Sequence, residues 1–288
     1  MRLTFPLAAA LLLASCTTRA PQPDPSYLSE LQQWRADRET RLKADNGWLT
    51  LVGLFWIEPG ISRIGSDPGS DVPLPPSLPA KLGTITLKGR EAQFTPSPGV
   101  DLKPATLHDD NTPNYEVVTT GTVSFYLIER GERFGIRVKD TQSPARTNFA
   151  GLDWYPPDPT WVVDAKLTPA PHKVKFDTEV GVVQDGDSPG YLDFDRAGQH
   201  YRVEPVTEDN ELFLVIRDAT SGKTTYAASR FIYASLPDKN GMTKLDFNKA
   251  YNPPCVFTAF ATCPLPPQQN RLTTAIEAGE KKYPGQAN

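Results

Sequence analysis

Short runs of alternating apolar and polar residues cover most of this chain, and turn-forming residues separate them. A period of two residues is typical of strands that bury one face, and regular spacing of such runs is typical of antiparallel sandwiches and barrels. The predicted strands are Ser62–Ile64, Gly83–Leu87, Ala92–Phe94, Tyr115–Val118, Thr122–Ile128, Arg133–Val138, His172–Phe176, Glu179–Gln184, Tyr191–Phe194, Gln199–Pro205, Leu212–Asp218 and Thr224–Phe231. The pattern therefore predicts a mostly β protein.

One segment near the N-terminus has helical spacing instead. Its apolar residues are Leu28, Leu31, Trp34 and Leu42. This spacing predicts an amphipathic helix within residues 26–46, with Ser26 near its start. Charged residues of alternating sign lie between the apolar ones, so we expect the charged face to be solvated.

The remaining elements divide into two packed antiparallel β modules, which are sandwich-like or barrel-like. Residues 47–128 form the first module and residues 129–288 the second. The second module contains a stiff loop, residues 241–271, which is braced by two Pro-Pro pairs. After this loop, Asn270 can cap a C-terminal helix that runs to about Lys282.

The first fifteen residues predict export. Arg2 precedes an apolar run that is too short to cross about 30 Å of hydrocarbon. The end of this run, Leu13-Ala14-Ser15-Cys16, resembles the lipobox of bacterial lipoproteins. The resemblance implies a signal peptide over residues 1–15, a lipid-anchored Cys16 and a tether over residues 16–25. Thr17 after the cysteine implies the outer membrane, facing the periplasm.

Charge and motif content exclude some partners. Loss of Arg2 with the signal peptide changes the formal net charge from -4 to -5, and no Lys/Arg cluster is present, which argues against nucleic acid. The chain has three histidines and no His-Glu-x-x-His pattern, so we predict no metal site and no cofactor. Protein partners cannot be identified from the sequence.

Cys255 and Cys263 remain as a pair once Cys16 is acylated. An oxidising compartment favours a disulfide between them. Two buried thiols remain an alternative, as does a cysteine nucleophile or a metal site. The spacing of seven intervening residues is unusual for zinc, and no histidine is near.

Polar residues concentrate in two stretches, one around residue 140 and one in the proline-braced loop. The candidate ligand-binding or catalytic residues are Arg137, Asp140, Arg146, Arg230, Asp246, Asn248, Tyr251 and Asn252. Arginine suits carboxylate or phosphate, and the other side chains can bind hydroxyls or carbonyls beside it. If the two stretches meet, they form a pocket for a small polar or anionic ligand. Alternatively, Asp246 caps a turn and pairs with Arg146 or Arg230 in a buried bridge that holds the loop.

Two sets of sequence segments resemble known families. The string Gly60-Ile-Ser-Arg-Ile-Gly-Ser-Asp67, followed by Asp71-Val-Pro-Leu74, is similar to the opening of forkhead-associated domains. Ser66 stands where that family has arginine, so phosphothreonine binding is not implied. A broader set of segments resembles domain-of-unknown-function family 1684 and comprises Cys16, Gly47–Trp56, Gly65–Asp67, Phe134–Asp140, Ser143-Pro144, Arg146 and Asp246–Cys255. This resemblance implies a shared β-rich fold and no activity.

Two classes of function therefore remain open. The first is a binding or scaffold lipoprotein of the cell envelope that takes a small polar or anionic ligand. The alternative is a hydrolase for a small polar substrate, with Asp246 or Asp140 as general base and Arg146 as anion stabiliser.

Overall fold

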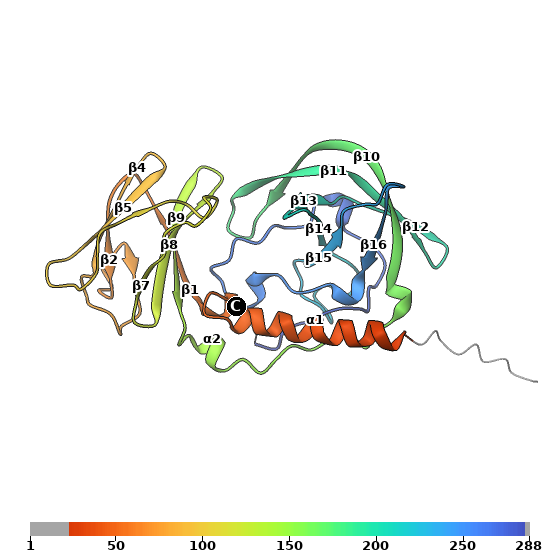
Figure 1. Cartoon of the computed structure of the whole chain (residues 1–288), viewed down its shortest axis with the longest axis horizontal. Helices are drawn as coiled ribbons and strands as arrows, with labels where there is room; N and C mark the ends of the chain where they lie inside the picture. Colours follow the sequence, from red (N-terminus) through yellow and green to blue (C-terminus); the bar gives the residue numbers. More distant parts are fainter. Residues whose placement is uncertain (1–22, 286–288) are drawn as a thin grey trace, which may run out of the picture.

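The computed structural model describes residues 23–285, so Cys16 and the expected signal peptide lie outside the described residues. Figure 1 shows two β-rich lobes side by side, with the long helix α1 (Pro25–Lys43) running beneath the second lobe. The mostly β fold class is confirmed. No helix among residues 23–285 is long and apolar enough to cross a membrane.

Helix α1 confirms the expected amphipathic helix, but its cap and its charged face differ from the prediction. Asp24 rather than Ser26 caps the helix and accepts a bond from the Ser26 backbone N–H at 2.7 Å. Leu31 and Leu42 are buried against the second lobe, as the apolar spacing predicts. Arg38 is also buried, at 8% exposure, so the expectation of a wholly solvated charged face is wrong.

The first lobe is a sandwich of two sheets. One sheet has the order β1-β9-β8-β7, and the other has the order β3-β2-β4-β5-β6. The strands are β1 (Leu51–Ile57), β2 (Gly60–Gly65), β3 (Val72–Pro73), β4 (Gly83–Lys88), β5 (Glu91–Pro96), β6 (Ala105–Leu107), β7 (Val118–Thr120), β8 (Val123–Arg130) and β9 (Arg133–Asp140). Phe94 and Phe125 join the two sheets edge to face, with ring centroids 5.2 Å apart. The expected module boundary at residue 128 falls inside β8, and this sheet continues to Asp140.

The second lobe pairs a long, bent sheet with a short one. The long sheet has the order β12-β11-β10-β16, and the short sheet has the order β13-β14-β15. The strands are β10 (Val162–Asp177), β11 (Val183–Arg196), β12 (Gln199–Val203), β13 (Val206–Glu208), β14 (Glu211–Ile216), β15 (Arg230–Ser235) and β16 (Met242–Asp246). Their shared core includes Leu192, Phe194, Leu214 and Ile232. The expected strand Thr224–Phe231 begins later, because residues 218–225 form a hydrogen-bonded loop.

The expected C-terminal helix is wrong. Among the described residues after Asn270 there is no helix, and the chain instead runs extended against the second lobe. The Asn270 amide does not cap a helix, because it exchanges two hydrogen bonds with the Glu204 backbone at 2.7 and 2.9 Å. Ile276 and Ala278 are buried in the core, and the Ile276 carbonyl accepts a bond from Arg230 at 2.9 Å. The apolar residues of this segment are therefore buried by an extended chain rather than by one face of a helix.

Candidate functional site

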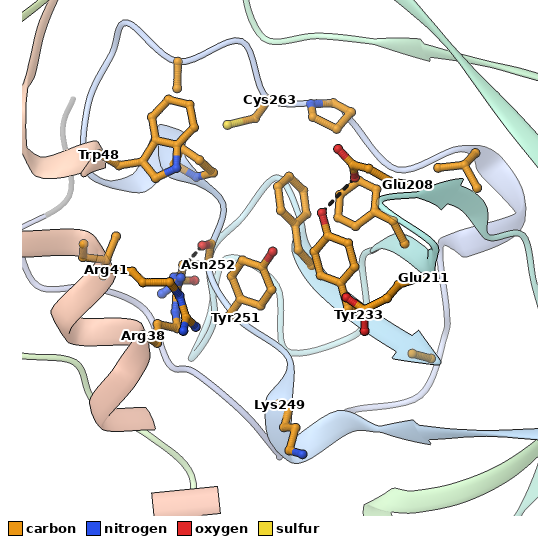
Figure 2. Close-up of a pocket in the computed structure, with 18 of the residues that line it drawn as sticks. Arg38, Arg41, Trp48, Glu208, Glu211, Tyr233, Lys249, Tyr251, Asn252 and Cys263 are labelled. Carbon is orange, nitrogen blue, oxygen red and sulfur yellow. Dashed lines mark hydrogen bonds between the residues drawn. The ribbon is translucent and has the colours of Figure 1, made fainter. Parts of the chain in front are cut away.

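A cavity of about 1240 Å³ opens where the two lobes meet α1. Its walls come from α1, from the sheet β13-β14-β15, from the loop after Tyr251 and from the arginines of β8 and β9. Figure 2 shows α1 side chains on one side of this cavity and Tyr233 with two glutamates on the other. Among the eight predicted site residues, those that line the cavity are Arg137, Asp246, Tyr251 and Asn252.

The proline-braced loop forms one wall because both of its ends are held. Tyr251 forms an isolated bridge with Phe231, with two backbone bonds of 2.8 and 3.0 Å. Further along, Cys255 and Cys263 lie at disulfide distance, with Cα atoms 6.1 Å apart, which confirms the expected pair. Cys263 lines the cavity directly, so the bridge shapes the wall.

Arg137 is the buried cation of the site. It is 3% exposed and lies on β9, in a sheet that the alternating pattern predicted. Its Nη2 donates to the Thr262 hydroxyl at 3.2 Å, and its guanidinium lies 5.2 Å from the centroid of the Trp48 ring. Its Nε has no hydrogen-bond partner within residues 23–285.

The charge of Arg137 is incompletely neutralised. The carboxylate of Asp110 lies 3.8 Å from Arg137, but it makes two 2.7 Å hydrogen bonds to Arg130 instead. Two guanidinium groups thus share one carboxylate beside the cavity. Burial, and secondarily the Arg137 charge, lowers the pKa of nearby Lys139 to about 8. Because a single carboxylate faces both Arg130 and Arg137, this corner of the site carries excess positive charge.

Helix α1 adds two further arginines, which are not among the site residues predicted from the sequence. Arg38 donates to the Glu280 carboxylate at 2.6 Å and to the Asn252 carbonyl at 2.8 Å. Its guanidinium lies 4.3 Å from the centroid of the Tyr251 ring. Arg41, one turn further on, is exposed and lines the cavity. Arg38 stands at helical spacing from buried Leu31 and Leu42. This spacing could have predicted its place on the inward face of the helix.

Aromatic rings form the opposite wall. The Tyr233 and Tyr251 rings are parallel to within 9°, with centroids 6.5 Å apart, and Phe213 packs 4.9 Å from Tyr233. The Tyr233 hydroxyl donates to Glu208 at 2.8 Å. Burial raises the pKa of Tyr251 to about 12, so this phenol stays protonated at neutral pH.

Asp246 lines the cavity but is already engaged by hydrogen bonds. The Tyr27 hydroxyl lies 3.0 Å from each of its carboxylate oxygens, and the Asn248 backbone N–H donates to it at 3.0 Å. Burial raises the pKa of Asp246, and the bond from Tyr27 opposes that shift. Asp246 therefore joins α1 to the second lobe, and the expected pairing with Arg146 or Arg230 is wrong.

The other four predicted residues do not line the cavity. Arg146 forms an ion pair with Asp45 at 2.6 Å and binds the Lys43 and Thr141 carbonyls. Arg230 is 1% exposed and is paired with Asp218. Asn248 binds the Asp158 backbone through both its amide atoms, and Asp140 caps the turn at Gln142. Each therefore holds a local structure, and Arg146 pairs with Asp45 rather than facing the general bases Asp140 or Asp246 of the hydrolase alternative.

Two other arrangements could support catalysis, a serine nucleophile and a metal centre. Gly186-Asp187-Ser188-Pro189-Gly190 fits Gly-x-Ser-x-Gly, but Ser188 lies within strand β11, 2% exposed, and its hydroxyl donates to the Gly190 carbonyl at 2.9 Å. The strand-to-helix turn that exposes a nucleophilic serine is therefore missing there. Residues 23–285 contain no cluster of three or more His, Cys, Asp or Glu side chains that could hold a metal ion.

The second lobe is similar to a described family. Residues 147–281 match the model of a family described as "Protein of unknown function (DUF1684)". This match covers just under half of the chain and supports the resemblance in the second lobe. The resembling segments of the first lobe lie outside it.

Comparison with individual proteins assigns no activity to this chain. No curated protein matches the chain. An uncharacterized protein of Haloarcula marismortui, solved by NMR, is 33% identical, with a TM-score of 0.40. The similarity covers 47% of this chain and 78% of that one.

Proposed function

We propose that this protein is a binding module whose cavity takes a small anionic ligand. The observation that carries the proposal is Arg137, a buried cation at the cavity wall with an unpartnered Nε. Its nearest carboxylate already binds Arg130 through both oxygens. A buried charge without a full partner is costly, and a ligand carboxylate or phosphate would complete the set of hydrogen bonds.

The cavity has the composition of a binding site. Aromatic rings supply apolar contact area, and a few charged and amide groups supply orientation. The rigid disulfide loop holds Thr262, and the Thr262 hydroxyl accepts bonds from both Arg130 and Arg137 at 3.2 Å. The arginines are therefore positioned before any ligand binds, which lowers the entropic cost of binding.

Thermal unfolding of the full-length chain with acetate, citrate, phosphate or sulfate, at constant ionic strength, tests the proposal. A true ligand at about 100-fold above its Kd should stabilise the fold by about 2.7 kcal/mol. Arg137→Gln should abolish this gain, whereas Arg133→Gln, an exposed arginine of the same strand, should keep it. Equal responses of the two variants would overturn the proposal. Arg41 also lines the cavity but is exposed. Arg41→Gln therefore provides a second test of anion binding in which no buried side chain is changed.

We also propose that the chain is lipid-anchored through Cys16 at the bacterial cell envelope. The support is the sequence alone: Leu13-Ala14-Ser15-Cys16 after a basic start and an apolar run. Labelled palmitate should be incorporated into the wild type and not into Cys16→Ser when both are expressed in a bacterial host. Labelling of both chains, or of neither, would contradict the anchor.

A further inference from the structure

The two ends of the cavity have opposite polarity. At the arginine end, the free Nε of Arg137 is a hydrogen-bond donor. At the aromatic end, Glu208 and Glu211 lie beside Tyr233, as Figure 2 shows, and both line the cavity. Ionised carboxylates only accept hydrogen bonds. A ligand that fits both ends therefore carries an acid group at one end and hydroxyl or amine donors at the other.

A buried amide of the cavity lining also calls for a donor on the ligand. Asn252 is 1% exposed and lines the cavity, and its Nδ2 donates to Glu280 and to the Lys281 carbonyl. Its Oδ1 has no donor within residues 23–285. A buried amide oxygen left without a donor is costly, so this position suits a hydroxyl of a bound ligand.

The aromatic wall suits a ligand with several saturated rings. Phe213, Tyr233 and Tyr251 form a continuous strip, since neighbouring centroids are 4.9 and 6.5 Å apart. Flat aromatic faces pack against the C–H faces of sugar rings, while the ring hydroxyls project sideways to polar groups. The cavity of about 1240 Å³ exceeds the range of roughly 300–1,000 Å³ typical of pockets for one small molecule.

We infer that the cavity binds an acidic oligosaccharide. Sugar rings lie on Tyr233 and Tyr251, and their hydroxyls donate to Glu208, Glu211 and the Asn252 Oδ1. A uronic-acid carboxylate binds Arg137. This inference rests on the proposed function, because the carboxylate is the anionic group taken by Arg137.

Isothermal titration of the full-length chain with aldotetraouronic acid, a xylotriose that carries one glucuronic acid at one end, and with its methyl ester tests the inference. The ester keeps the rings and the ring hydroxyls but removes the single negative charge. We expect the acid to bind and the ester to bind at least about tenfold more weakly. Tyr251→Leu and the exposed Glu208→Gln should each weaken the acid about tenfold or more, whereas exposed Glu132→Gln, outside the cavity, should not.

The outcomes separate this inference from the proposed function. If citrate or phosphate binds through Arg137 and aldotetraouronic acid does not, the oligosaccharide inference fails and the anion site stands. If the acid and the ester bind equally, the carboxylate is not recognised and the oligosaccharide inference fails, whereas the anion site is decided by the citrate and phosphate measurements. If a nucleoside monophosphate binds more tightly than the oligosaccharide, the sugar assignment is overturned.

Discussion

The Thr262 hydroxyl oxygen lies 3.2 Å from Nη2 of Arg137, although the two residues are 125 positions apart in the chain. This hydrogen bond joins the disulfide loop of the second lobe to strand β9 of the first. The loop and the segment near residue 140 thus meet, as the sequence predicted. They meet through Arg137 and Thr262, whereas Asp140 and Arg146 lie away from the cavity lining.

The first prediction concerns the pair formed by Arg38 and Glu280. Glu280 is 0% exposed and accepts bonds from Arg38 and from the Asn252 amide, both at 2.6 Å. Glu280→Gln leaves the Arg38 guanidinium buried without a countercharge, which should cost about 3–5 kcal/mol of unfolding free energy. Urea denaturation measures this loss. Exposed Glu277→Gln on the same segment should change it by less than about 0.5 kcal/mol.

The second prediction concerns the cavity-lining disulfide. The double variant Cys255→Ser, Cys263→Ser should lose about 2–3 kcal/mol of unfolding free energy, because the small closed loop no longer restricts the unfolded chain. It should also bind anions more weakly, because Thr262 is no longer held beside Arg137. A reducing agent should destabilise the wild type and leave the double variant unchanged. If the reducing agent does not change the stability of the wild type, the bridge contributes nothing to the unfolding free energy.

The third prediction is a pH dependence from Asp246. Burial raises its pKa in the folded protein above the unfolded value near 3.8. The folded state therefore holds this proton more tightly, so the contribution to stability is complete below the unfolded pKa and is lost as pH rises through the folded pKa. Asp246→Asn removes this dependence. The unfolding free energy of the variant minus that of the wild type should therefore increase as pH rises from below 3.8 through the folded pKa. A difference that stays flat or decreases would contradict the shift.

Local patterns predicted much of the fold. Alternating runs marked strands such as β4 and β5, because each buries one face. Strands β8 and β9 were also predicted, although their central residues are buried on both faces. The apolar spacing marked α1, and an oxidising compartment favoured the Cys255–Cys263 pair. The prediction of a C-terminal helix was wrong for two reasons. Ile276 is buried equally well from an extended chain, and Gly279, at φ +81°, has a conformation that ends helices.

The site was harder to predict, because its partners are distant in the chain. Arg38 pairs with Glu280, 242 residues away, and within its own segment it resembled one more solvated charge. Arg137 was predicted from its residue type, but its incomplete neutralisation depends on how Arg130 binds Asp110. Arg230 was selected for the same chemistry and instead pairs with Asp218 inside the fold. Residue type therefore indicates which chemistry is available, and only the fold decides where it is used.

The most direct test of the anion site is an anomalous difference map from crystals of this protein soaked in selenate. Selenate presents oxygens as sulfate does, and its selenium can be located without any assumption about the ligand. We expect a selenium peak from a selenate whose oxygens lie within hydrogen-bond distance of the Arg137 Nε, in the wild type and not in Arg137→Gln. Occupied selenate sites elsewhere, with none beside Arg137, would contradict it.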